Sequence, residues 1–360
     1  MNLDPYRNEV APRREEIPGG AVLLSLPMRT AHAVTFGVWL RTGSQDEPAG
    51  LGGISHFIEH IVFKGTKNHS AFMLAATFDR LGAAVDAFTT KDLVAFTVKV
   101  LPEYFAEAVE LLAEMLLEPA FEPQLVRLEQ DVVCEEIQEA LDTPEDRLHD
   151  AFAARLYGGH SRGRAILGSP AAVRSFEPNL LRSYHRRLFH PSNMVLSLAG
   201  NIQEGFTEAI AHLFARPDVA ADGFDAGSGP GPGQPAAAVV DLDLESVDPF
   251  RMDINSPIIQ TYFEVGNLGV GYEHDDRVPV YLLTNLLGGG MSSRIFQAVR
   301  EREGLAYTVY NYNDMGRDIG LVSCAGSCSP DKLERLEDVI RMEYLRLADE
   351  GIAETELESN

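Results

Sequence analysis

Ser55-His56-Phe57-Ile58-Glu59-His60-Ile61-Val62-Phe63-Lys64 is the most informative stretch of the 360-residue chain. If it forms a helix, its two histidines lie four residues apart on one face, and Glu59 points into the same space. The neighbouring residues are apolar, and burying three polar side chains among them without partners would be costly. Two imidazoles beside a carboxylate suit a Zn²⁺ ion and an attacking water. We therefore predict His56 and His60 as metal ligands and Glu59 as the general base.

A catalytic zinc site needs a further protein ligand, and the best candidates lie in residues 129–137. Glu129 and Glu136 are seven residues apart, so two helical turns place them on one face, whereas Glu135 points elsewhere. One of the pair could ligate the metal while the other holds a ligating histidine. Acidic residues on a helix also commonly form a solvated face, and the spacing alone leaves both interpretations open.

The composition limits the class of protein. The net charge is −24, with 45% hydrophobic and 23% charged residues, which is typical of a globular chain and unfavourable for binding nucleic acid. The chain has three cysteines, Cys134, Cys324 and Cys328, and this small, odd number argues against a disulfide framework. The N-terminus has no apolar core of a signal peptide, and no apolar run reaches membrane-spanning length. We therefore expect a cytoplasmic protein.

The pattern of strands, helices and turns predicts an α+β fold with two related domains. Residues 217–236 are rich in glycine and proline and predict a linker. The β-α-β-β-α character of the chain before the linker recurs after it, without the metal motif. The expected organisation is an N-terminal extension at 1–16, a zinc-binding domain at 17–216, this linker, and a second domain at 237–360 that contacts the substrate.

Residues 56–66, His-Phe-Ile-Glu-His-Ile-Val-Phe-Lys-Gly-Thr, resemble the inverted zinc motif of the pitrilysin/insulinase metallopeptidases, which include the mitochondrial processing peptidases. In that family a glutamate roughly 76 residues after the second histidine is the third ligand, and it maps to Glu136. A second glutamate one heptad earlier maps to Glu129. The resemblance implies one Zn²⁺ per chain, held by His56, His60 and Glu136. It also implies that Glu129 hydrogen-bonds a ligating histidine and that Glu59 is the general base.

The second domain carries a further resemblance in Leu287–Phe296 and Val299–Tyr307. The family has an arginine and a tyrosine seven residues apart, which map to Arg300 and Tyr307. The resemblance implies that both polarise the scissile carbonyl and stabilise the oxyanion. The charged run around Arg300 is equally typical of a solvated helix face, so the sequence alone does not choose between the two.

A strand near the metal pairs with the substrate backbone in this family, and it maps to Asp86–Thr89. Asp86 stands where the family commonly has asparagine, so an ordinary strand with a surface aspartate remains an equal interpretation.

The resemblance implies a zinc endopeptidase, of the inverzincin type, acting on peptides or unfolded segments. Two-domain members pair, which implies a homodimer or a heterodimer with a related subunit. The alternative is a non-catalytic partner subunit, although such subunits typically have eroded zinc motifs and this motif is intact. The family's closing helices and last strand have no counterpart before Asn360, so we expect a C-terminally short second domain with an open sheet edge.

Overall fold

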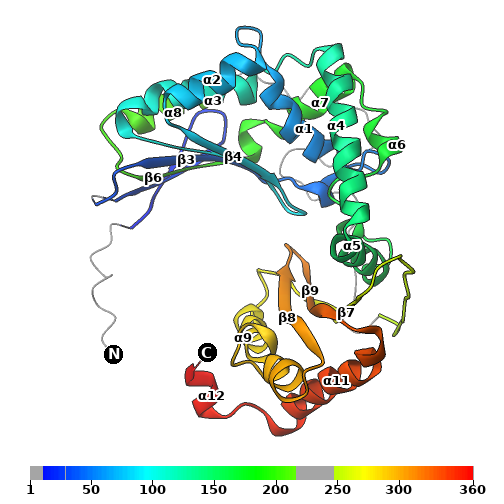
Figure 1. Cartoon of the computed structure of the whole chain (residues 1–360). Coiled ribbons are helices and arrows are strands. Elements are labelled where there is room, and N and C mark those ends of the chain that lie inside the picture. Colours follow the sequence, from blue (N-terminus) through cyan, green and yellow to red (C-terminus); the bar gives the residue numbers. More distant parts are fainter. Residues whose placement is uncertain (1–10, 29, 216–246, 360) are drawn as a thin grey trace. The chain divides into compact units, whose positions relative to one another are not determined.

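The computed structural model describes residues 11–28, 30–215 and 247–359, which form two compact units (Figure 1). Within the described residues, the first unit comprises 11–28, 30–137 and 164–215, and the second comprises 138–163 and 247–359. The predicted linker at 217–236 lies outside the described residues. The units differ from the predicted domain ranges because Gln138–Gly163, expected in the zinc-binding domain, packs with the second unit.

The first unit is built on a mixed sheet. Within the described residues it has the strand order β1-β2-β6-β3-β5-β4, and only the β2–β6 pair is parallel. The bounds are β1 Arg13–Glu16, β2 Val22–Pro27, β3 Val34–Leu40, β4 Ala84–Thr89, β5 Val94–Val100 and β6 Met194–Gly200. Strand β4 therefore lies at one edge of this sheet. Strand β1, which was expected to be part of an extension, pairs with β2 at the opposite edge.

Helices cover one face of this sheet, as α2, α3 and α8 show in Figure 1. The helices of this unit are α1 Ile54–Ile61, α2 Ala71–Arg80, α3 Phe105–Leu117, α4 Pro123–Asp142, α6 Pro170–Val173, α7 Pro178–Leu188 and α8 Phe206–Phe214. Phe57 and Ile58 of α1 are fully buried in the same core as Phe36 and Phe96 of the sheet. Burying each such side chain stabilises the fold by about 1.5–3 kcal/mol, so the core fixes the metal-motif helix firmly.

The second unit repeats part of this architecture. Its antiparallel strands have the order β7-β9-β8, as the strands β3-β5-β4 do in the first unit. The elements are α5 Pro144–Leu156, β7 Thr261–Val270, α9 Arg277–Gly288, α10 Arg294–Phe296, a π-helical turn at Gln297–Arg302, β8 Ala306–Met315, β9 Ile319–Cys328, α11 Leu333–Glu350 and α12 Glu354–Ser359. This arrangement confirms the predicted α+β class.

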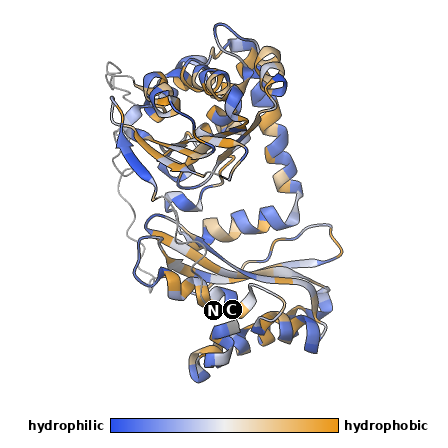
Figure 2. Cartoon of the chain, turned by 90° about the vertical axis from the view of Figure 1, so that its left-hand side faces the viewer, coloured by the Kyte–Doolittle hydropathy of each residue, from blue (hydrophilic) through white to orange (hydrophobic). Residues whose placement is uncertain are grey.

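Hydropathy follows the packing in both units. Figure 2 shows apolar colour along the strands and on the inner sides of the helices. No helix in the described ranges combines the length and the apolar character that crossing a bilayer requires.

Polar contacts explain why Gln138–Gly163 belongs to the second unit. Nδ1 of His149 on α5 lies 2.7 Å from Oε2 of Glu264 on β7, and the side chain of Glu264 is fully buried. The hydroxyl of Tyr312 on β8 donates to Oε1 of the same carboxylate at 2.5 Å. Arg162 pairs with Asp314 at 2.9 Å. These contacts tie the segment to the sheet of the second unit, which local sequence patterns cannot reveal.

The contact of His149 with Glu264 predicts a pH-dependent stability. The hydrogen bond to Glu264 raises the pKa of His149 above its ordinary value of 6.5. A raised histidine pKa gives a contribution that is fully present below pH 6.5 and is lost as the pH rises through the raised pKa. In thermal unfolding, the wild type should exceed His149→Gln in midpoint most at about pH 6 and least at about pH 9. His32→Gln, at an exposed position, is the control. A difference independent of pH would contradict this contribution.

Candidate metal centre

The N-terminus of α1 is fixed by a buried carboxylate. Glu47 accepts hydrogen bonds from the backbone N–H groups of Gly53 and Ser55, each at 2.8 Å. Burial raises the pKa of Glu47 to about 7, although these hydrogen bonds act in the opposite direction. Gly53 has φ +92°, and a Cβ at this position would lie 2.4 Å from the carbonyl oxygen of Leu167. A close backbone approach therefore requires glycine just before the helix.

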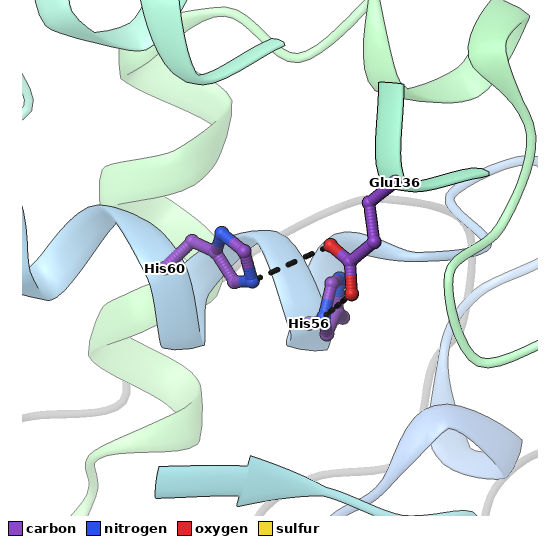
Figure 3. Close-up of side chains that lie close together, drawn as sticks. All are labelled: His56, His60 and Glu136. Carbon is purple, nitrogen blue, oxygen red and sulfur yellow. Dashed lines mark ion pairs between the residues drawn. The ribbon is translucent and has the colours of Figure 1, made fainter. Parts of the chain in front are cut away.

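Three predicted ligands lie together where α1 faces α4 (Figure 3). Nε2 of His56 is 3.5 Å from Oε1 of Glu136, and Nε2 of His60 is 3.6 Å from Oε2 of the same carboxylate. One ligand atom from each residue lies within 4.8 Å of the others. The structure therefore brings together the two histidines predicted as ligands and the glutamate that the family resemblance implies as the third.

These separations fit a shared metal ion better than hydrogen bonds. Hydrogen bonds between nitrogen and oxygen are about 2.7–3.2 Å long, so both contacts are too long. Two atoms that each lie about 2.1 Å from a tetrahedral zinc are about 3.4 Å apart. Two imidazole nitrogens and a carboxylate are also a donor set that zinc enzymes use. The residues present therefore fit Zn²⁺.

The histidines differ in protonation. Burial, and to a smaller extent the neighbouring His60, lower the pKa of His56 to about 4, so His56 is neutral at physiological pH. Burial also lowers the pKa of His60, but its hydrogen bond to Glu129 and the charge of Glu136 raise it more, and the net shift is upward. Only a deprotonated ring nitrogen binds a metal, so protons compete with the ion at His60.

A contact with Glu129 fixes the orientation of the His60 ring. Oε1 of Glu129 lies 2.8 Å from Nδ1 of His60, which leaves Nε2 directed at Glu136. Its Oε2 lies 2.7 Å from Nζ of Lys64, and only 3% of its side chain is exposed. Burial raises the pKa of Glu129, but the hydrogen bonds from His60 and Lys64 lower it below its ordinary value. Glu129 is therefore an ionised carboxylate that orients the ring, and its part in metal binding stays a prediction from the family resemblance. The contact of Lys64 with Glu129 was not predicted from the sequence, although Lys64 lies only four residues after His60.

Glu59 lies beside this group and lines a small pocket. Oε2 of Glu59 accepts a hydrogen bond from the Thr89 hydroxyl at 2.6 Å. Burial raises the pKa of Glu59, which favours proton uptake. The pocket has a volume of about 300 Å³ and lies between α1, α4 and the edge strand β4; its lining residues are Glu59, His60, Phe63, Lys64, Val85, Asp86, Ala87 and Glu129. The strand predicted to hold substrate therefore borders the candidate site.

Arg300 and Tyr307 lie together in the second unit. The Arg300 guanidinium is 4.4 Å from the centre of the Tyr307 ring and 5.0 Å from that of Phe296. Arg300 lies on the π-helical turn, and Tyr307, at 78% exposed, is the second residue of β8. The structure thus brings the two residues into contact with each other, and their roles toward a substrate stay predictions.

Comparison with known proteins places the chain in a family. Residues 22–169 match the model described as insulinase (peptidase family M16), and residues 175–360 match the peptidase M16 inactive domain. The chain is 35% identical to an uncharacterized zinc protease, YmxG, of Bacillus subtilis, over 92% of this chain and 77% of that protein. It is 36% identical to an uncharacterized zinc protease of Mycobacterium tuberculosis, over 96% of this chain and 77% of that protein.

Solved structures share the fold. A protease from Helicobacter pylori has a TM-score of 0.84 at 20% identity, covering 97% of this chain and 82% of that one. A peptidase M16 inactive domain from Pseudomonas fluorescens has a TM-score of 0.82 at 21% identity, with the same coverage. The chain belongs to the insulinase family, peptidase family M16. The suspected family relationship and the two-domain fold are therefore confirmed.

Proposed function

We propose that this chain is a zinc-dependent endopeptidase that hydrolyses peptides or unfolded segments. The observation that carries the proposal is the convergence of His56, His60 and Glu136, whose ligand atoms lie within 4.8 Å of one another. These three residues would hold the ion, and Glu129 would keep His60 in the orientation that binding needs. When bound, Zn²⁺ supplies a Lewis acid that activates water and polarises a peptide carbonyl.

The protein's own residues supply proton transfer and substrate alignment. Glu59 takes the proton of the attacking water and later delivers it to the leaving amine. Strand β4 lies at the sheet edge beside Glu59, so an extended peptide can pair with it through main-chain hydrogen bonds. Arg300 and Tyr307 of the second unit stabilise the oxyanion in this proposal.

The partner in this proposal is a second copy or a related subunit. The second candidate function, a non-catalytic subunit, draws support from the inactive-domain description of residues 175–360. The ligand residues and Glu59 lie in the other matched part, residues 22–169. An intact metal and base set is not needed in a scaffold, which favours the peptidase.

The test combines metal content with peptide cleavage. We expect about one zinc per chain and hydrolysis of a quenched basic peptide that a chelator abolishes and added zinc restores. A basic peptide is chosen because the chain has a net charge of −24. A folded, zinc-loaded protein that cleaves no peptide would overturn the catalytic proposal and favour the scaffold.

A further inference from the structure

The carboxylate of Glu59 is held asymmetrically. Its Oε2 accepts the hydroxyl hydrogen of Thr89 at 2.6 Å. Its other oxygen, Oε1, makes no hydrogen bond within the part of the chain that the structure describes. Thr89 is the last residue of the edge strand β4, and it is 30 positions from Glu59 in sequence. One carboxylate oxygen is thus engaged by the strand, and the other is available for proton transfer.

The position of Thr89 is fixed by the turn that follows it. The carbonyl oxygens of Thr90 and Lys91 accept hydrogen bonds from the backbone N–H groups of Ser44 and Gln45, each at 3.0 Å. Backbone hydrogen bonds of this length hold the end of β4 against the segment 44–45. The Thr89 hydroxyl therefore sits on a strand end that is anchored from outside the sheet.

The same segment also fixes the helix that carries Glu59. It leads directly into Glu47, whose carboxylate accepts from Gly53 and Ser55 at the start of α1. Arg164 adds hydrogen bonds to the carbonyl oxygens of Gln45 and Glu47, at 3.1 and 3.0 Å. Residues 44–47 thus set the separation between the end of β4 and the start of α1, and so between Thr89 and Glu59.

We propose that Thr89 is a positioning residue for Glu59: its hydroxyl fixes Oε2 and presents Oε1 to the attacking water. This inference rests on the proposed peptidase function. A carboxylate on a flexible side chain samples several rotamers, and holding one of them aligns the base with its proton. The arrangement also makes the orientation of the base depend on the same edge strand that would pair with substrate.

Two substitutions separate positioning from packing. Thr89→Val keeps the branched shape and removes the hydroxyl, whereas Thr89→Ser keeps the hydroxyl. We expect Thr89→Val to lower kcat by about tenfold, which corresponds to loss of one hydrogen bond to a charged group, with KM and zinc content little changed. Thr89→Ser should recover most of the lost rate. Thr35→Val, on β3 of the same sheet and also partly buried, is the matched control and should cleave normally.

A measurement on the metal-free protein tests the contact without catalysis. Thr89→Val should lower the thermal unfolding midpoint by about 2–4 °C when Glu59 is present. It should have a smaller effect in a Glu59→Ala background, because the acceptor is already gone. Equal shifts in both backgrounds would mean that the two side chains do not interact, and would overturn the inference.

The outcomes distinguish this inference from the function on which it rests. Suppose that the wild type cleaves peptide and loses this activity with a chelator. If Thr89→Val then cleaves as fast as the wild type, the role of Thr89 is overturned and the peptidase function is not. A zinc-loaded wild type that cleaves nothing overturns the peptidase function, and the role of Thr89 falls with it. A loss of rate in Thr89→Val that Thr89→Ser restores supports both.

Discussion

Glu59→Gln should bind zinc as the wild type does and lose about 100-fold or more of kcat, because general-base catalysis is worth about 10²–10⁴-fold. Glutamine has nearly the same shape as glutamate, and its amide oxygen can still accept the Thr89 hydroxyl hydrogen that Oε2 accepts now. It cannot take up a proton from water near neutral pH. The substitution therefore removes the proton transfer and leaves the fold and the three metal ligands in place.

Metal analysis and single-turnover cleavage of the same preparation provide the measurement. The zinc content shows that the site is loaded, and the single-turnover rate isolates the chemical step from product release. Undiminished cleavage by zinc-loaded Glu59→Gln would exclude Glu59 as the base. Thr35→Val serves again as a control for handling and folding.

Glu136→Gln should lose zinc, whereas Glu135→Gln should keep it. Glu136 faces both histidine nitrogens, and Glu135 is an exposed neighbour on the same helix. A neutral amide oxygen is a weaker ligand for Zn²⁺ than a carboxylate. Changing a residue that hydrogen-bonds a metal ligand typically lowers metal affinity by about 10–100-fold, so loss of the ligand itself should lower it by at least about 100-fold.

Competition with a chromogenic chelator measures this difference directly. The two variants remove the same charge from adjacent positions of one helix, so a general electrostatic effect would change both affinities equally. Equal zinc affinities for Glu135→Gln and Glu136→Gln would rule out Glu136 as the third ligand. Tight zinc binding by both would point to a different donor set.

Helical spacing explains why so much of the candidate site was predictable. His56, Glu59 and His60 lie on one rigid helix, and so do Glu129 and Glu136. Within a helix, sequence separation fixes direction, so the spacing of each set determines which side chains share a face. The resemblance to the family then identified which of the two glutamates faces the histidines.

The unpredicted features depend on contacts between distant segments. Strand β1 was not predicted because all four residues of Arg13–Glu16 are exposed and carry no alternation of apolar residues. The sequence predicts Thr89 within a strand, but its hydrogen bond to Glu59 depends on how β4 lies beside α1. The membership of Gln138–Gly163 in the second unit depends on partners such as Glu264, which follow more than 100 residues later. No local pattern encodes such choices.

The meeting of α1 with α4 has a consequence for the unfolded chain. An ion held by His60 and Glu136 would act as a reversible crosslink that closes a loop of roughly 75 residues. An ion that binds only the folded state stabilises that state by about 2.7 kcal/mol when its free concentration is 100 times its dissociation constant. The proposed metal would therefore serve both catalysis and folding. A chain that loses the ion would lose its activity and also the crosslink between α1 and α4, two helices that are distant in sequence.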